Sequence, residues 1–228
     1  MLLSDRELAA LRGRLIVSAQ AYPGEPMRNP QTMAQVAASA VIGGAAAVRV
    51  QGIADIQFTR SAVEVPVIGL FKDGHEGVFI TPTIHHALAV AQAGAHIVAL
   101  DGTRRERPDG ESLRQTITAV HEQTGALVMA DCGSLDDALA SAEAGADLIG
   151  TTLAGYTGER AKTDGPDLEL LELIAAAGLD RPLVAEGRIH TPAQARAALE
   201  AGAFSVVVGT AITHPASITG WFDAALRR

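Results

Sequence analysis

The sequence predicts an α/β fold: a (β/α)8 TIM barrel preceded by a short N-terminal capping helix. Eight short runs rich in valine, isoleucine and leucine alternate with alanine-rich stretches of helical spacing. A sequence repeat also recurs four times, and each repeat spans two strand-helix units. The 228 residues, 48% of them hydrophobic, suffice for one large core and fall below the size at which a core usually divides. We therefore expect residues 1–228 to form a single barrel domain.

The eight predicted strands are short and apolar, and turn or capping residues separate them from the helices. They are LIVSAQ from Leu15, AAVRVQ from Ala46, VPVIGLFK from Val65, HIVALD from His96, ALVMAD from Ala126, DLIGTT from Asp147, PLVAEG from Pro182 and SVVVGT from Ser205. Helix starts are indicated by Asn29 before Pro30, by Ser134 and by Thr191 before Pro192. Residues 4–12 are expected to form the capping helix over the N-terminal end of the barrel.

The repeat joins the end of a helix to the start of the next strand. Its four copies are IGGAAAVRV, QAGAHIVAL, EAGADLIG and EAGAFSVVVG, with marker glycines at Gly44, Gly94, Gly145 and Gly202. Glycine at a helix C-terminus favours the left-handed cap, and alanine allows the next strand to pack closely. Four such repeats favour a closed barrel over an open doubly wound sheet. The open sheet is the alternative fold, but the usual GxGxxG after the first strand is missing.

Composition narrows the classes of partner. The formal net charge is -8 and aromatic residues make up 4%, so neither nucleic acid nor an anionic membrane surface is an expected partner. The sequence has no apolar run of 18 residues, so we expect no membrane span, and the first residues lack the pattern of a signal peptide. The single cysteine, Cys132, cannot form an intramolecular disulfide. We expect a cytoplasmic, reducing location.

Polar side chains gather toward the carboxyl ends of the predicted strands, whose bodies are almost wholly apolar. In a parallel barrel these ends form one rim, where the loops that follow the strands build the active site. One charge at a strand end is often merely solvated, but a whole ring of them favours a functional site. The ring consists of Ser18, Gln20, Arg49, Gln51, Lys72, Asp101, Asp131, Thr151, Thr152, Glu186 and Thr210.

Lys72 and Glu186 are the sharpest pair in this ring. They follow the third and seventh strands, which stand opposite each other in an eight-stranded barrel. A substrate between them would meet an amine on one face and a carboxyl group on the other, as proton removal and return on opposite faces of a carbon requires. A buried Lys72–Glu186 salt bridge and a Schiff base formed by Lys72 are the alternatives.

Two further features concern phosphate and metal. Gly187 with Arg188, and Gly209 with Thr210, follow the last two strands, which is the common phosphate position in barrels of this kind. The histidines are His75, His85, His86, His96, His121, His190 and His214. None of their spacings matches a metal-ligand motif, so we expect no metal site.

The chain resembles the N-acetylmannosamine-6-phosphate 2-epimerase family from about Leu15 to its C-terminal region. In chain order the motifs are SAQA from Ser18, PGEP from Pro23, VRVQG from Val48, IGLFK ending at Lys72, VFITPT from Val78, ALDGTRRERP from Ala99, MADC from Met129, GTTLAGYT from Gly150, AEGRIHTP from Ala185 and VVVGTAITHP from Val206. The resemblance implies interconversion of N-acetylmannosamine 6-phosphate and N-acetylglucosamine 6-phosphate in sialic acid catabolism, without cofactor or metal. It also implies a homo-oligomer, typically a dimer.

The resemblance also implies roles for individual residues. Lys72 and Glu186 would be the acid and base at the second carbon of the sugar, and Gln20, Arg49 and Asp131 would orient the sugar. Thr151 is expected to contact the substrate, while Gly187, Arg188, Gly209, Thr210 and His214 would hold the phosphate. A phosphosugar lyase, aldolase or decarboxylase that uses Lys72 is the alternative enzyme, and a non-catalytic ligand-binding barrel is a third possibility.

The sequence departs from the family pattern at four positions. Ala19, Gly102 and Ala154 stand where the family often has cysteine, alanine and serine, respectively. His214 stands where the family usually has arginine. Histidine is half charged only near pH 6.5, so we expect His214 to make phosphate affinity depend on pH.

Overall fold

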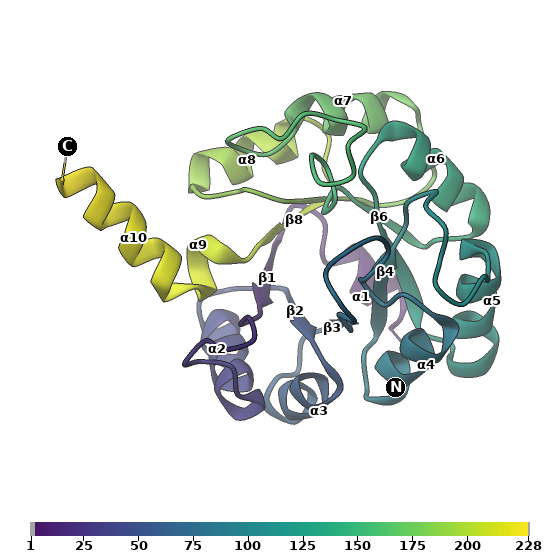
Figure 1. Cartoon of the computed structure of the whole chain (residues 1–228), viewed down its shortest axis with the longest axis horizontal. Coiled ribbons are helices and arrows are strands. Elements are labelled where there is room, and N and C mark those ends of the chain that lie inside the picture. The colour runs from purple at the N-terminus through teal and green to yellow at the C-terminus, as the bar shows by residue number, and fades with distance from the viewer. Residues whose placement is uncertain (1–2, 228) are drawn as a thin grey trace.

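The computed structural model describes residues 3–227, and its eight parallel strands close into a barrel in the order β1 to β8 (Figure 1). The strands are β1 Leu15–Ala19, β2 Ala47–Gln51, β3 Val67–Leu70, β4 Ile97–Asp101, β5 Leu127–Asp131, β6 Leu148–Gly150, β7 Leu183–Glu186 and β8 Ser205–Val208. Each strand pairs with its sequence neighbours, and β1 pairs with β8 to close the ring. The predicted (β/α)8 barrel is therefore confirmed, and the open sheet is wrong.

Helices surround this barrel as an outer layer (Figure 1). They are α2 Pro30–Ile42, α3 Ile53–Ala62, α4 Ile84–Gln92, α5 Leu113–Thr124, α6 Leu135–Ala144, α7 Leu168–Ala176 and α8 Pro192–Glu200, followed by α9 Thr210–Thr213 and α10 Pro215–Leu226. The predicted caps Asn29, Ser134 and Thr191 each accept hydrogen bonds from backbone N–H groups of the first turn. None of the helices within residues 3–227 is long and apolar enough to cross a membrane.

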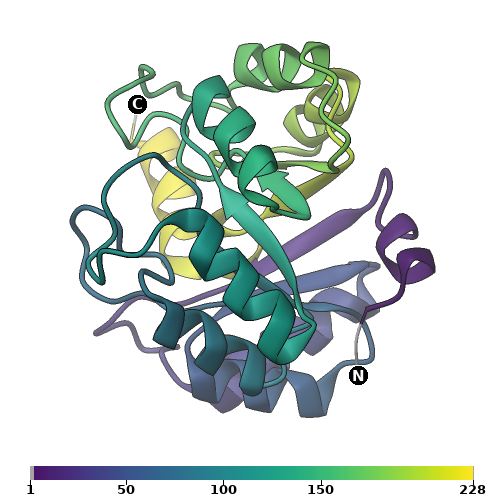
Figure 2. The same ribbon diagram turned by 90° about the vertical axis from the view of Figure 1, so that its right-hand side faces the viewer.

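The capping helix α1 spans Asp5–Ala9, which is shorter than the predicted residues 4–12. Ser4 and Glu7 form a capping box at its start, and the chain turns after Ala10 toward Gly13, whose φ is +69°. Leu11 follows the helix and is buried in the inner core. Figure 2 shows α1 at one end of the barrel and the long loops that follow the strands at the other.

Two hydrophobic clusters follow from the alternation of strand residues. The inner cluster includes Ile16, Ile68, Ile97, Met129, Leu148, Val184 and Val207, which fill the barrel. The outer cluster joins the intervening strand residues to the helices. The marker glycines of the repeat all have left-handed backbones, with φ values of +104°, +109°, +106° and +102°, so the predicted caps are confirmed.

Candidate active site

Arg49 lies at the centre of the polar rim. Its side chain is 1% exposed and points into the barrel from β2, because it shares the inward face with Ala47. Its Nη2 donates to Asp131 Oδ2 at 2.6 Å and its Nη1 to Asp131 Oδ1 at 3.0 Å. The same Nη1 donates to Glu186 Oε2 at 2.6 Å. The structure thus brings together three predicted site residues from β2, β5 and β7 in one buried ionic cluster.

The charges of this cluster shift the pKa values of its members. Burial disfavours the charge of Arg49, but Asp131 and then Glu186 outweigh this effect and raise its pKa, so the guanidinium stays charged. Burial raises the pKa of Glu186, Arg49 opposes that rise, and Asp131 adds to it. The carboxyl group of Glu186 is therefore easier to protonate than an ordinary glutamate.

Lys72 follows β3, on the side of the barrel opposite Glu186. Within the described part of the chain it forms no ion pair, so the alternative of a Lys72–Glu186 salt bridge is wrong for this structure. Its Nζ lies 5.5 Å from the ring centroid of Tyr22, which comes from the loop after β1. Burial lowers the pKa of Lys72, and the neighbouring charge of Arg49 lowers it further. The amine is therefore easier to deprotonate than an ordinary lysine.

The two threonines after β6 have different tasks. Thr152 Oγ1 lies 2.7 Å from Asp131 Oδ1 and 3.2 Å from Glu186 Oε2, so its hydroxyl touches both carboxylates. Thr151 Oγ1 instead donates to the backbone oxygen of Glu186 at 3.0 Å and accepts from its N–H at 3.1 Å. Thr151, the predicted substrate contact, supports β7, and Thr152 completes the ionic cluster. Every second side chain of a strand lies on the same face, so the series Leu148, Gly150, Thr152 is the sequence signal that points to Thr152.

The loop after β1 covers another part of the mouth. Gln20 Nε2 donates to Ser18 Oγ at 2.8 Å, which fixes the amide beside the inward-facing serine of β1. Tyr22 lies above Lys72 and was not predicted from the sequence. Burial raises the pKa of Tyr22, and the nearby Glu25 and Tyr156 add to this rise. Its phenol therefore stays protonated at neutral pH.

The two predicted phosphate segments lie side by side, because β7 and β8 are paired with Glu186 opposite Val207. Arg188 has a left-handed backbone, with φ of +54°. Its guanidinium donates to the backbone oxygens of Ala154 and Gly165 and to Thr163 Oγ1. Three of its five N–H groups thus support the loop between β6 and α7, and the other two take no part in these bonds.

Gly209 and Thr210 begin α9 directly after β8. A Cβ atom on Gly209 would lie 3.3 Å from Ser18 Cβ, so the absence of a side chain allows close contact with β1.

His214 is the residue between α9 and α10. Its Nδ1 accepts from the Ser217 N–H at 3.2 Å, and its Nε2 contacts Glu25 Oε1. These partners assign the proton to Nε2, which then donates to Glu25. Both ring nitrogens are used within the protein, so the imidazole caps α10 and ties it to the loop after β1.

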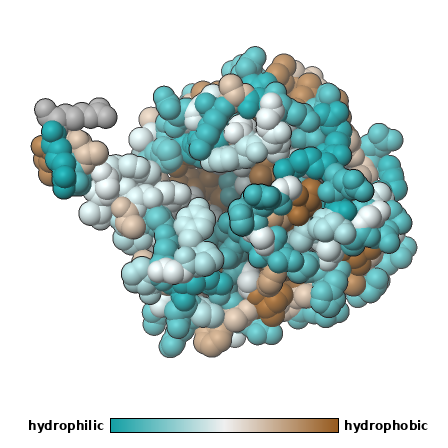
Figure 3. All heavy atoms as spheres, viewed as in Figure 1, coloured by the Kyte–Doolittle hydropathy of each residue, from teal (hydrophilic) through white to brown (hydrophobic). Residues whose placement is uncertain are grey.

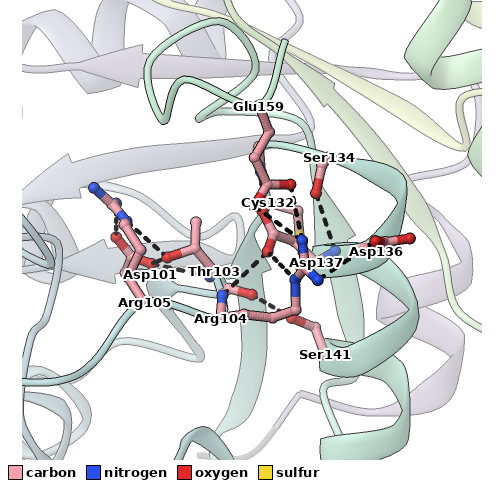
Figure 4. Close-up of polar contacts among 12 residues, drawn as sticks. Asp101, Thr103, Arg104, Arg105, Cys132, Ser134, Asp136, Asp137, Ser141 and Glu159 are labelled. Atoms are coloured by element: carbon pink, nitrogen blue, oxygen red, sulfur yellow. Dashed lines mark hydrogen bonds and ion pairs between the residues drawn. The ribbon is translucent and has the colours of Figure 1, made fainter.

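A second polar cluster braces the loops beside the mouth (Figure 4). Arg104 Nη2 lies 2.9 Å from Glu159 Oε1, and its Nε lies 3.3 Å from Asp137 Oδ1. It thereby links the loop after β4 to α6 and to the loop after β6. Cys132 is fully buried in this region, and burial raises the pKa of its thiol. The buried thiol therefore packs as a small side chain in this structure. Within residues 3–227 no group of three or more His, Cys, Asp or Glu side chains is arranged to hold a metal ion.

The fold and the rim together define a (β/α)8-barrel enzyme with a cluster of ionisable side chains at the carboxyl ends of its strands. The sequence model of the family described as "Putative N-acetylmannosamine-6-phosphate epimerase" matches residues 33–228. The chain belongs to this family, so the resemblance found in the sequence is confirmed.

Individual relatives agree with this assignment. A protein from Cutibacterium acnes (strain DSM 16379 / KPA171202), named "Putative N-acetylmannosamine-6-phosphate 2-epimerase", is 62% identical over 225 residues, covering 98% of each chain. A protein of the same name from Klebsiella pneumoniae (strain 342) is 49% identical over 94% of this chain and 90% of its own length.

Solved structures give the same result. The N-acetylmannosamine-6-phosphate 2-epimerase from Clostridium perfringens is 36% identical, with a TM-score of 0.93 and 99% of both chains covered. A thiamine phosphate pyrophosphorylase from Pyrococcus furiosus, 22% identical with a TM-score of 0.58, shares the fold.

Proposed function

We propose that the chain is an isomerase that interconverts N-acetylmannosamine 6-phosphate and N-acetylglucosamine 6-phosphate by proton transfer at the second carbon of the sugar. The observation that carries this proposal is the opposed pair of Lys72 and Glu186. Lys72 has a lowered pKa and Glu186 a raised one, so the amine gives up a proton and the carboxylate takes one up more readily than the ordinary side chains do. Family membership supports the substrate.

The proposed reaction needs only protons to move. Ring opening gives an aldehyde, whose carbonyl acidifies the proton on the adjacent second carbon. Either Lys72 or Glu186 removes this proton. The electrons of the broken carbon–hydrogen bond move toward the carbonyl oxygen and give an enolate. The other member then delivers a proton to the opposite face, and the aldehyde is restored with inverted configuration. The fixed positive charge of Arg49 favours the developing oxyanion.

We assign the remaining contacts by position. Gln20, Asp131 and Thr152 lie on the inner rim and would orient the sugar hydroxyl and amide groups, with Thr151 behind them. Gly187, Arg188, Gly209 and Thr210 would hold the phosphate through backbone N–H groups and the two free N–H groups of Arg188. His214 lies at the edge of this region.

Proton NMR in deuterated water tests the proposed function. N-acetylmannosamine 6-phosphate should give N-acetylglucosamine 6-phosphate with deuterium at the second carbon, in the presence of a chelator. Lys72→Ala should lower turnover by roughly 100 to 10,000-fold. Product without label in single-turnover experiments would contradict proton exchange with solvent. Trapping of a Lys72 adduct by borohydride would instead support a Schiff-base lyase or aldolase.

We also propose a homodimer, and α10 supports this proposal. Figures 1 and 3 show this helix projecting from the barrel, and none of its described residues is buried. Phe222 is 70% exposed and Leu226 is 87% exposed. Exposure of such large apolar side chains to water is unfavourable and unusual for an isolated chain. An apolar groove of about 380 Å³ lies beside α8, lined also by residues of β8, of α9 and of the start of β1. Phe222→Glu should convert a dimer into a monomer in sedimentation experiments, whereas Arg227→Glu, directly after the same helix, should not.

The cytoplasm is the proposed location. The support comes from the substrate, because sugar phosphates are charged and do not cross a lipid bilayer unaided. Fractionation of cells with an antibody to the chain would test this location.

A further inference from the structure

The end of β3 that leads to Lys72 pairs only briefly with β4. The two strands are in register at Ile68 with Ile97 and at Gly69 with Val98; β6 and β7 also have two such pairs, whereas β4 and β5 have five. Beyond these pairs the chain that carries Lys72 leaves β4. Residues 79–81, from the loop after β3, fill the gap between them.

This inserted segment makes backbone contacts on both sides. On the β3 side, Lys72 and Ile80 form an antiparallel bridge, and the Asp73 N–H donates to the Phe79 oxygen at 3.0 Å. On the β4 side, the Asp101 N–H donates to the Ile80 oxygen at 2.9 Å. The backbone of Lys72 is therefore held by residues 79–81, which we call the wedge, and not by hydrogen bonds between the strands of the barrel.

Thr81 anchors this wedge with every polar group that it has. Its N–H donates to the Phe71 oxygen at 2.6 Å, and its Oγ1 accepts from the Phe71 N–H at 3.1 Å. The same hydroxyl donates to the Ala99 oxygen of β4 at 2.6 Å. One side chain thus bonds to the residue before Lys72 and to the neighbouring strand. Thr81 is fully buried, so water cannot replace these bonds.

The backbone of Thr81 is strained. Its φ is +46°, a region that β-branched residues rarely adopt. Glycine or asparagine would suit this backbone better, so the presence of threonine indicates that the hydroxyl is needed there. Arg107 stabilises the strained turn, because its Nη2 donates to the Thr81 oxygen at 2.9 Å and its Nη1 to the Asp101 oxygen at 2.8 Å.

We infer that Thr81 is the positioning residue for Lys72, with its hydroxyl fixing the end of β3 so that the lysine amine stays over the mouth of the barrel. Its catalytic consequence rests on the proposed function, whereas the placement of Lys72 can be measured without any substrate. The charged groups that surround Lys72 are Arg49 from β2, Asp131 from β5 and Glu186 from β7. Movement of the amine away from them changes its pKa.

The pKa of Lys72 can be measured directly by NMR, because Lys72 and Lys162 are the two lysines of the sequence. Protein labelled with ¹³C at the lysine ε-carbon gives two signals, which Lys162→Arg assigns. In the wild type, Lys72 should titrate below its usual pH range. In Thr81→Val, which keeps the shape and removes the hydroxyl, it should titrate closer to that range. Thr81→Ser should restore the wild-type titration, and Lys162 serves as the internal reference.

Kinetics provide the second readout. Thr81→Val should lower kcat by roughly 10 to 100-fold while KM stays within about twofold, because the lysine loses its place and the sugar keeps its contacts. Thr81→Ser should stay within about threefold of the wild type. Thr59→Val is the matched control, since Thr59 is also fully buried and its hydroxyl has no partner among the described residues.

The outcomes separate the two proposals. If Thr81→Val folds and leaves both the Lys72 titration and kcat unchanged, Thr81 does not position the lysine. If this variant does not fold, Arg107→Gln decides by the same two readouts, because it removes the bridge between the Thr81 and Asp101 oxygens without adding a third lysine signal. An unchanged Lys72 titration and an unchanged kcat in this variant would overturn the positioning role. An altered Lys72 titration in a chain whose wild type does not epimerise would keep the positioning role and overturn the proposed function.

Discussion

Arg49 donates a 2.6 Å hydrogen bond to Glu186 across the barrel, from β2 to β7. The carboxylate is therefore held by a guanidinium that stays charged, and Lys72 remains outside the ion pair. This separation matters because a lysine bound tightly to Glu186 would be locked in its protonated form. In this structure the Lys72 amine and the Glu186 carboxylate are instead separate ionisable groups, and each still influences the pKa of the other.

The first prediction concerns the pH dependence of kcat. In either direction one member of the Lys72–Glu186 pair must be protonated and the other deprotonated, so the active pair carries one proton in total. Activity should fall at low pH, when the pair gains a second proton, and at high pH, when it loses the last one. Burial raises the pKa of Glu186 from its ordinary 4.5, so the acid limb of the profile should lie above pH 4.5. Burial lowers the pKa of Lys72 from its ordinary 10.5, so the alkaline limb should lie below pH 10.5. The pH profiles of kcat should coincide for the two directions of the reaction. Limbs at the ordinary pKa values of glutamate and lysine would contradict the shifts.

The second prediction assigns the two faces. Glu186→Gln should lower epimerisation by roughly 100 to 10,000-fold, because one face loses its proton donor and acceptor. Lys72 still reaches the other face, so one epimer should exchange its C2 proton with deuterated water while the other should not. Lys72→Ala should show the complementary preference. Exchange of both epimers at the wild-type rate would show that Glu186 takes no part in proton transfer.

The third prediction separates the adjacent threonines. Thr152→Val removes a hydrogen bond that lowers the pKa of Glu186, so the acid limb of the kcat profile should move to higher pH. Thr151→Val should leave this limb in place, because its hydroxyl bonds to the backbone of β7. It should instead reduce the free energy of unfolding by about 1 to 3 kcal/mol in urea titrations, since two buried groups lose a partner. An unchanged limb in both variants would mean that Thr152 does not act on Glu186.

The sequence was sufficient to predict most of this architecture. The strands are short apolar runs bounded by capping residues, and the repeated glycines each adopt a left-handed backbone. Arg49, Asp131 and Glu186 could be placed at one rim because side chains alternate along a strand, and Lys72 continues that alternation two residues beyond β3.

Residues in loops could not be placed in this way. Tyr22 contacts the lysine from the loop after β1, and Thr81 bonds to Phe71 and Ala99 through the folding of its own loop, neither of which periodicity encodes. Arg188 lies just beyond β7, where a left-handed backbone changes the direction of the side chain. Its support of the loop after β6 depends on that local turn, and strand alternation therefore could not predict it.

The fourth prediction concerns stability at the other end of the barrel. His96 is 9% exposed, and its Nδ1 accepts from the Val67 N–H at 3.0 Å. Burial, with a contribution from Arg60, lowers its pKa to about 4 from an ordinary 6.5. The unfolded chain therefore binds the proton more tightly, and roughly 3 kcal/mol of stability should be lost as pH falls from 6.5 through 4. Urea titrations measure this loss. His96→Asn keeps a hydrogen-bond acceptor and should show a shallower fall over the same range; an equal fall would exclude His96 as its source.

The last prediction concerns His214, where the family usually has a permanent charge. In this structure the imidazole is held between Ser217 and Glu25, in a tautomer that donates to the carboxylate. His214→Arg would place a permanent cation beside the phosphate segment, whereas histidine as a residue type gains its charge only as the pH falls. The variant should therefore have a lower KM at pH 8 and a smaller advantage at pH 6. Comparison with the wild type at each pH cancels the titration of the substrate phosphate itself.

His121→Arg is the matched control, because His121 also bonds to a carboxylate, Asp147, but lies at the end of α5. It should leave KM unchanged at both pH values. An equal advantage of His214→Arg at pH 6 and pH 8, or none at either, would show that this residue does not bind the phosphate as a cation. In that case the capping of α10 and the contact with Glu25 account for the histidine, and backbone N–H groups with Arg188 carry the anion.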